Sequence, residues 1–142
     1  MSKIISVHSF RGGTGKSNTT ANLAGIIAGR GLRVGVIDTD INSPGIHVLF
    51  GLDEDEIKYS LNDYLWGKCE IEKAAYDVTD NLNKNLGDGA EPIPANGKIF
   101  LIPASIKVAE IARILREGYD VGLLNDGSQT LIKELTLAVL SI

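Results

Sequence analysis

The sequence has 142 residues, a length that predicts one domain with enough chain to bury a hydrophobic core. Apolar residues make up 44% and charged residues 23%, values that argue against a largely disordered chain. The net charge of −4, with no segment rich in lysine and arginine, argues against a large permanent nucleic-acid-binding surface. The single cysteine, Cys69, excludes a disulfide framework and any zinc site with two or more thiolate ligands.

The sequence shows no targeting segment. Its first residues, from Met1 to Ile5, lack the apolar core and cleavage site of a signal peptide. No apolar run approaches the roughly 20 residues of a membrane span. We therefore expect a cytoplasmic protein without a transmembrane segment.

The first forty residues predict a strand–helix–strand unit. Residues 4–10 are β-branched and aromatic and predict a buried strand, and residues 11–15 form a glycine-rich turn. A helix is predicted over 16–29 and a second strand over 32–37. Because the helix carries the chain back between the two strands, we expect parallel pairing with a right-handed crossover.

Shorter elements are predicted in the remainder of the chain. Helices are expected at residues 60–66, 70–76, 107–117 and 128–135, and strands at 98–103 and 137–142. Strands that alternate with helices predict an α/β fold with a mostly parallel sheet.

Three segments of the chain carry more specific expectations. Residues 77–98 are rich in asparagine, glycine and proline and predict a long polar connection, and residues 53–56 predict a solvated acidic face. The helix at 107–117 is amphipathic. We expect core packing, rather than membrane binding, to explain its apolar stripe of Val108, Ile111, Ala112 and Leu115.

A glycine-rich loop between the first strand and the first helix is the strongest functional signal. It reads Arg11-Gly12-Gly13-Thr14-Gly15-Lys16-Ser17, followed by Asn18. Bare glycine backbone and the start of a helix can wrap a polyphosphate with N–H groups. Lys16 can supply charge to the β and γ phosphates, and the Ser17 hydroxyl can bind Mg²⁺. The alternative is a glycine-rich turn that binds no ligand.

Two aspartates follow the second strand. Asp38 and Asp40 come at its carboxyl end, where open α/β sheets place their ligands. Beside a phosphate loop they could support phosphoryl transfer, which needs charge neutralisation and an oriented water molecule. The alternative is a solvated turn with a capping aspartate.

The loop departs from the common P-loop pattern, which has a glycine where this chain has Phe10. A basic residue followed by Gly-Gly-x-Gly-Lys-Ser resembles the deviant phosphate loop of the ParA/MinD family of ATPases. Residues 18–24 resemble that family's first helix, residues 36–40 its second-strand acidic motif, and residues 43–45 the start of its switch region. The resemblance implies a P-loop NTPase-like three-layer sandwich, here truncated.

The resemblance also implies roles for individual residues. ATP would be bound by Gly12, Gly13, Thr14, Gly15, Lys16, Ser17 and Asn18, and Mg²⁺ by Ser17 with Asp38 nearby. Asp40 would position the attacking water, and Lys16 and Arg11 would complete the catalytic set. The family usually has lysine at position 11, which reaches the partner subunit's ATP in a sandwich dimer. Arg11 keeps the charge but changes its reach and geometry.

One expected feature lies beyond the sequence. A P-loop ATPase carries an acidic residue after a further apolar strand. Residues 137–142 fit that strand, and no residue follows Ile142. We therefore expect residues 1–142 to form a single, incomplete nucleotide-binding domain, an N-terminal portion or a shortened product. We expect its final strand to lack neighbours and to expose an edge.

Three functions remain open from the sequence. The first is a Mg²⁺-dependent switch ATPase that forms an ATP-dependent homodimer and positions DNA, a division site or other cargo. Its DNA or membrane-linked partners would be reached through C-terminal elements that this chain lacks. The second is a non-catalytic nucleotide-binding module, and the third is an ATP-dependent biosynthetic ligase of related fold.

Overall fold

A computed structural model describes residues 3–9, 15–41, 44–84, 91–132 and 137–141 of the chain. In these residues a five-stranded sheet has the order β1-β5-β2-β4-β3. Its strands are β1 (Lys3–Val7), β2 (Arg33–Asp38), β3 (Tyr76–Asp77), β4 (Lys98–Ile102) and β5 (Leu137–Ser141). The first four strands in that order pair in parallel, and β3 pairs antiparallel with β4. The mostly parallel α/β sheet predicted from the sequence is therefore confirmed.

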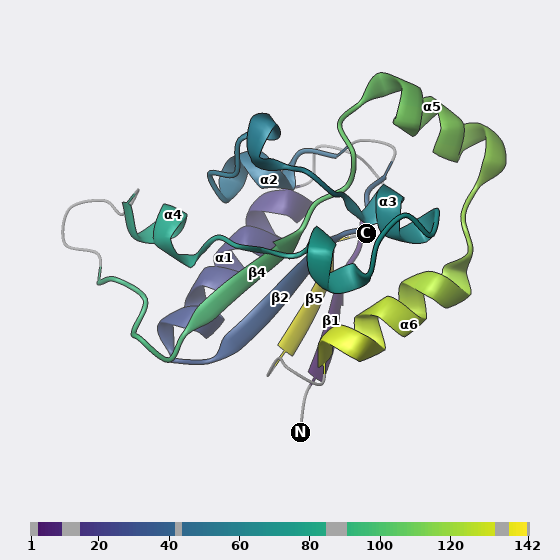
Figure 1. Ribbon diagram of the computed structural model, residues 1–142. Coiled ribbons are helices and arrows are strands. Elements are labelled where there is room, and N and C mark those ends of the chain that lie inside the picture. Colours follow the sequence, from purple (N-terminus) through teal and green to yellow (C-terminus); the bar gives the residue numbers. More distant parts are fainter. Residues whose placement is uncertain (1–2, 10–14, 42–43, 85–90, 133–136, 142) are drawn as a thin grey trace.

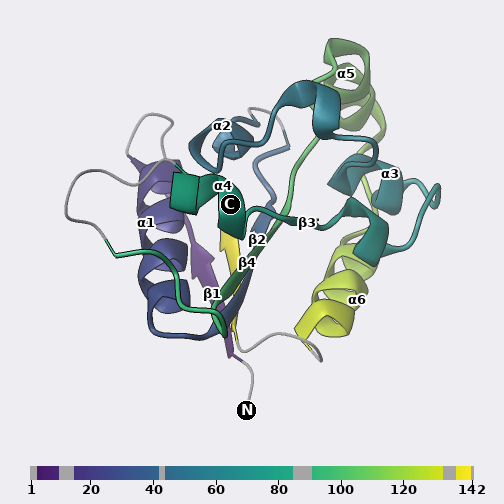
Figure 2. The same cartoon turned by 60° about the vertical axis from the view of Figure 1, so that its left-hand side comes forward.

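The helices cover both faces of the sheet (Figure 1). They are α1 (Lys16–Gly29), α2 (Ile46–Leu49), α3 (Leu61–Leu65), α4 (Thr79–Lys84), α5 (Val108–Glu117) and α6 (Val121–Ile132), with 3-10 turns η1 (Glu54–Glu56) and η2 (Ile71–Ala74). Figure 2 shows α1 on one side of the sheet and α3 and α6 on the other. This is the three-layer arrangement that the resemblance to the ParA/MinD family implies.

The alternation of side chains along the central strands divides the core in two. On β2, Val34 and Val36 face α1, whereas Ile37 joins the cluster under α3. On β4, Leu101 faces α1 and Ile102 faces α3. Successive strand residues point to opposite faces, so both faces of these two strands are buried.

A close approach of backbones joins α1 to the start of β4. A Cβ atom on Gly97 would collide with the backbone carbonyl oxygen of Ala28, and both residues are buried. Glycine at position 97 therefore lets the chain enter β4 directly against the end of α1.

Two expectations for the sheet are wrong: that the final strand exposes an edge, and that the first strand is buried. β5 does not lie at an edge, because it pairs with β1 on one side and β2 on the other. β1 pairs only with β5 among the described strands, and its residue Ile4 is 43% exposed. The crossover through α6 inserts β5 between two earlier strands, so order along the chain does not give order in space.

The polar connection predicted at 77–98 contains regular structure. The carboxylate of Asp77 accepts hydrogen bonds from the N–H and the hydroxyl of Thr79, at 3.0 and 2.6 Å. These contacts start α4, directly after the short strand β3. Local side-chain hydrogen bonds thus order a segment whose composition is typical of a loop.

Other helix predictions are corrected in extent. The helix expected at 70–76 is the short 3-10 turn η2, followed by β3. The one expected at 128–135 begins earlier, at Val121, where the Asp120 carboxylate accepts the Gly122 N–H at 2.8 Å. The short helix α2 and the turn η1 are additions, and the acidic residues of η1 are exposed as predicted.

Helix α5 forms where predicted but does not bury its apolar stripe. Only Ile114 of this helix is buried, whereas Val108 is 81% and Leu115 64% exposed. Figure 1 shows α5 beyond the carboxyl ends of the strands, away from the sheet. The prediction that this stripe packs on the core is therefore wrong. The helix projects past the sheet surface that the stripe was expected to cover.

Candidate functional site

Three of the predicted site residues meet at the carboxyl ends of the parallel strands. Lys16 opens α1 after β1, Asp38 ends β2, and Asp40 follows Asp38 by two residues. The end of β5 lies alongside, with Ser141 in register with Asp38. The topology thus converges on one end of the sheet, the place where open α/β folds bind ligands.

Lys16 and Asp40 form an ion pair. The Lys16 Nζ atom lies 3.1 Å from Asp40 Oδ2, and the two side chains are 15% and 31% exposed. One turn further along α1, the hydroxyl of the buried Thr20 donates to the Lys16 carbonyl oxygen at 2.9 Å. This partly buried ammonium is a strong local positive charge with one carboxylate partner.

Asp38 is a buried carboxyl group, 2% exposed. Its Oδ1 atom accepts the backbone N–H of Asp40 at 3.1 Å, and the backbone N–H of Gly45 donates to the same carboxyl group. Burial raises the pKa of Asp38 to about 7, with a further increase from the negative charge of Asp40, against the lowering effect of these N–H groups and of Lys16. In the nucleotide-free chain, burial therefore favours the neutral, protonated form of Asp38.

The start of α1 is suited to an anion. Its N-cap is Gly15, in the left-handed region at φ +84°, and within the described chain no side chain caps the helix and its first turn has no acidic residue. Helix N-termini leave N–H groups without partners and carry partial positive charge. Together with Lys16 this end of α1 matches the chemistry of a phosphate group.

Not all predicted site residues can be placed. Ser17 is half-buried and Asn18 exposed in the first turn of α1. The remaining predicted nucleotide ligands (Arg11, Gly12, Gly13 and Thr14) lie outside the described residues. Their roles, and those of Ser17 and Asn18, stay predictions.

The sequence did not reveal how Gly45 is connected to the site. Gly45 is the N-cap of α2, and its N–H reaches the carboxyl group of Asp38. The signal in the sequence is the Pro44-Gly45 pair, which indicates a turn and is followed by the mainly apolar residues of α2. Through this contact α2 is joined directly to the end of β2.

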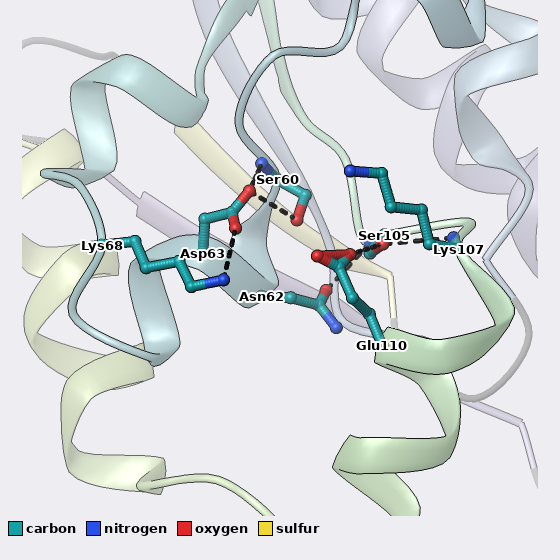
Figure 3. A network of polar contacts seen from close by, with 7 residues as sticks. All are labelled: Ser60, Asn62, Asp63, Lys68, Ser105, Lys107 and Glu110. Atoms are coloured by element: carbon teal, nitrogen blue, oxygen red, sulfur yellow. Dashed lines mark hydrogen bonds and ion pairs between the residues drawn. The ribbon is translucent and has the colours of Figure 1, made fainter.

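A second polar network, which does not include Lys16, joins α3 to the segment before α5 and is not predicted from the sequence (Figure 3). The buried Asn62 side chain accepts the backbone N–H of Ser105 at 2.9 Å, and the Ser105 hydroxyl donates to the Glu110 carboxylate. Asp63 accepts the Ser60 N–H at 2.9 Å and lies 3.9 Å from Lys68. The capping pattern of Ser60 and Asp63 is visible in the sequence, whereas the pairing of Asn62 with Ser105 depends on the tertiary fold.

Comparison with known proteins identifies relatives of this chain. A family model named ParA, described as "NUBPL iron-transfer P-loop NTPase", matches residues 1–72. The septum site-determining protein MinD of Helicobacter pylori is 34% identical over 125 residues, which are 88% of this chain and 44% of the relative. The chain thus spans less than half the length of this curated relative.

Solved structures match the fold over nearly the whole chain. The septum site-determining protein MinD of Pyrococcus horikoshii, complexed with Mg-ADP, gives a TM-score of 0.73 at 23% identity and covers 99% of this chain and 49% of its own. Cobyrinic acid a,c-diamide synthase of Mycobacterium smegmatis, with an ATP analogue and magnesium, gives 0.72 at 20% identity, covering 99% and 51%. At these identities the likeness shows the fold.

Two further features of the described residues bear on the site. None of their helices has the length and apolar character needed to cross a membrane. Nor do three histidine, cysteine, aspartate or glutamate side chains among them come together as a metal centre.

Proposed function

Because this chain belongs to the ParA/MinD family of P-loop NTPases, we propose that it binds ATP with Mg²⁺ at the Lys16 end of α1 and acts as a nucleotide-dependent switch. The main support is the ion pair of Lys16 with Asp40, 3.1 Å long, beside an uncapped helix start. A phosphate group would take the place of the Asp40 carboxylate as the partner of the ammonium. Asp40 would then be released next to the γ-phosphate.

The residues present fit a nucleotide and its metal ion. The first-turn N–H groups of α1 and the Lys16 ammonium would hold phosphate oxygens, with Gly12, Gly13, Thr14 and Asn18 around them. The Ser17 hydroxyl would hold Mg²⁺, and Asp38 would lie near it. Bound Mg²⁺ would neutralise negative charge on the phosphates. The related MinD of Pyrococcus horikoshii carries Mg-ADP, which supports this assignment.

In the proposed hydrolysis Asp40 orients the attacking water, while Lys16 and Arg11 neutralise charge that develops on the phosphates. Asp40 suits this role because its carboxylate is 31% exposed and can reach both solvent and Lys16. Asp38, buried and held by two backbone N–H groups, suits a fixed position instead. The two aspartates thus differ: Asp40 is a partly exposed, ion-paired carboxylate, and Asp38 is a buried carboxyl group.

The switch would be completed by a second copy of the chain. By resemblance to the family, ATP favours a sandwich dimer in which Arg11 reaches the partner's nucleotide, and hydrolysis releases it. The process served would be DNA partitioning, division-site placement or the positioning of other cargo in the cytoplasm. The septum-site role of the Helicobacter pylori relative supports the second of these.

Two alternatives make different predictions. A non-catalytic module would bind nucleotide without turnover. An ATP-dependent ligase is favoured by the fold shared with cobyrinic acid a,c-diamide synthase, and it would consume ATP only with a small acid substrate. Phosphate release measured with and without such an acid separates these alternatives from the switch ATPase.

The proposal is tested by isothermal titration calorimetry of the chain with a non-hydrolysable ATP analogue and Mg²⁺. We expect saturable binding by the wild type and none by Lys16→Ala, which removes the phosphate cation. The exposed Lys58→Ala, far along the chain from the loop, is the matched control and should bind as the wild type does. Equal affinity of the wild type and Lys16→Ala would contradict the assignment of the loop.

A further inference from the structure

A cavity of about 210 Å³ is lined by residues of the turn η1, the start of α3 and the start of α5. It is smaller than the roughly 300 Å³ at which sites for drug-sized ligands begin, so its occupant would be a small metabolite. None of Lys16, Asp38 and Asp40 lines it. The cavity is therefore not part of the nucleotide site proposed above.

The buried part of the cavity wall is polar and held in place by hydrogen bonds. Ser60 and Ser105 both line the cavity, and each is 4% exposed. The Ser60 N–H donates to Asp63 at 2.9 Å, and the Ser105 N–H donates to Asn62 at 2.9 Å. The Ser105 hydroxyl donates to the Glu110 carboxylate. A wall that is ordered before a ligand arrives lowers the entropic cost of binding.

The exposed part of the wall carries charges of both signs. Lys58, Lys107 and Glu54 line the cavity and are exposed. In the part of the chain that the structure describes, none of these three charged groups forms an ion pair. Figure 3 shows the Lys107 side chain extending from the start of α5 toward Ser60. Two ammonium groups and one carboxylate around this small space are therefore available to a ligand.

This mixture of charges selects the class of ligand. A phosphate or another anion would meet the carboxyl groups of Glu54, Asp63 and Glu110. A metal ion would meet the two ammonium groups, and the described residues bring no three histidine, cysteine, aspartate or glutamate side chains together. A molecule that carries both an ammonium and a carboxylate group complements both signs. Ile57 and Ile106 also line the cavity and offer apolar contacts, which an aliphatic amino acid would use.

We propose that this cavity binds a free α-amino acid with an aliphatic side chain. The carboxylate of the ligand would lie between the ammonium groups of Lys58 and Lys107, and its ammonium group would lie beside Glu54 and Glu110. The aliphatic side chain would contact the two isoleucines. The inference does not depend on nucleotide binding.

The amino-acid site is tested without nucleotide by isothermal titration calorimetry of the chain with L-leucine, which should show saturable binding. Two analogues each lack one charged group: 4-methylpentanoate has no ammonium, and 3-methylbutylamine has no carboxylate. Both should bind at least about tenfold more weakly, because hydrogen bonds to a charged group are lost. Glycine should also bind at least about tenfold more weakly, because it buries less apolar surface.

Matched variants place the binding in this cavity. Lys107→Met and Glu54→Gln should each weaken the affinity for L-leucine by about three- to fivefold, the effect of an exposed charge pair. Lys73→Met and Glu72→Gln remove exposed charges on η2 that do not line the cavity, and they should leave the affinity unchanged. The site is refuted if L-leucine does not bind, if either analogue binds as tightly as L-leucine, or if Lys107→Met binds as the wild type does.

Discussion

The Lys16 ammonium and the Asp40 carboxylate lie 3.1 Å apart across the end of the sheet, so the cation proposed for phosphate already has an internal partner. The pair is only partly exposed, which makes it stronger than an ion pair in open solvent. In the proposed binding of nucleotide, a phosphate takes the place of Asp40 as the partner of Lys16. This exchange would couple the arrival of nucleotide to the position of the carboxylate that would orient water.

Replacement of Asp40 by alanine should separate binding from turnover. The Asp40→Ala variant retains the Lys16 ammonium, so its affinity for the Mg²⁺–ATP analogue in calorimetry should not fall. Its rate of phosphate release should fall by about a hundredfold, the contribution of a residue that positions or activates water. Equal steady-state rates in the two proteins would remove Asp40 from the mechanism.

Asp38 should make the stability of the nucleotide-free chain depend on pH. Its folded pKa is about 7, above the ordinary 3.8, so between these values the folded chain holds a proton that the unfolded chain releases. The free energy of unfolding should therefore fall as pH rises from about 4 to about 7, by up to about 4 kcal/mol from this group. This contribution is constant outside that window.

The neutral variant Asp38→Asn should lose this pH dependence. Urea denaturation in metal-free buffer should show it to be more stable than the wild type at pH 8 and similar at low pH, because asparagine can still accept from the Asp40 and Gly45 N–H groups. Asp55→Asn, on the exposed turn η1, is the control. If the stability of Asp38→Asn depends on pH as that of the wild type does, a group other than Asp38 causes the pH dependence.

The capping box at the start of α3 should stabilise the fold more than the neighbouring ion pair. Asp63→Ala removes the acceptor of the Ser60 N–H, at 2.9 Å, and should lower the free energy of unfolding by about 1 kcal/mol. Lys68→Ala removes an ammonium that lies 3.9 Å from the Asp63 carboxylate and 5.4 Å from the centre of the Trp66 ring, two exposed contacts whose loss should change it by about 0.5 kcal/mol. A larger loss in Lys68→Ala than in Asp63→Ala, measured by urea denaturation, would contradict this order, because Asp63→Ala removes both the capping contact and the ion pair.

Arg11 is predicted to act across a dimer. Arg11→Ala should weaken ATP-dependent dimerisation, followed by light scattering, more than it weakens nucleotide binding by the monomer. The reason is that its guanidinium would contact phosphate of the partner subunit. If both the wild type and the variant remain monomeric in the presence of ATP, the proposed role of Arg11 across a dimer is contradicted.

The parts of the fold that the sequence predicts well are those with long, uniform patterns. The helix after the glycine-rich loop and the apolar strands ending at Asp38 and Ile102 were located to within a residue or two. The position of β5 between β1 and β2 is not predicted. An apolar strand has the same sequence pattern whichever two strands it lies between, so the pattern does not reveal its neighbours. The exposure of Val108 and Leu115 was missed for a similar reason: an amphipathic pattern shows that one face is apolar but does not show what covers it.

The site was predictable in outline. Lys16, Asp38 and Asp40 come together because parallel strands end at the same edge of the sheet. The direct pairing of Lys16 with Asp40, the burial of Asp38 and its contact with Gly45 arise from packing between segments distant in sequence. None of these three is encoded in the spacing of the motif.

A structure of this chain with a non-hydrolysable ATP analogue and Mg²⁺ is the most direct measurement of the central claim. It should show the phosphates against residues 11–17, with the Lys16 Nζ atom moved from Asp40 to a phosphate oxygen. A structure grown at saturating analogue in which the loop holds no phosphate and Lys16 still lies against Asp40 would contradict nucleotide binding at this site.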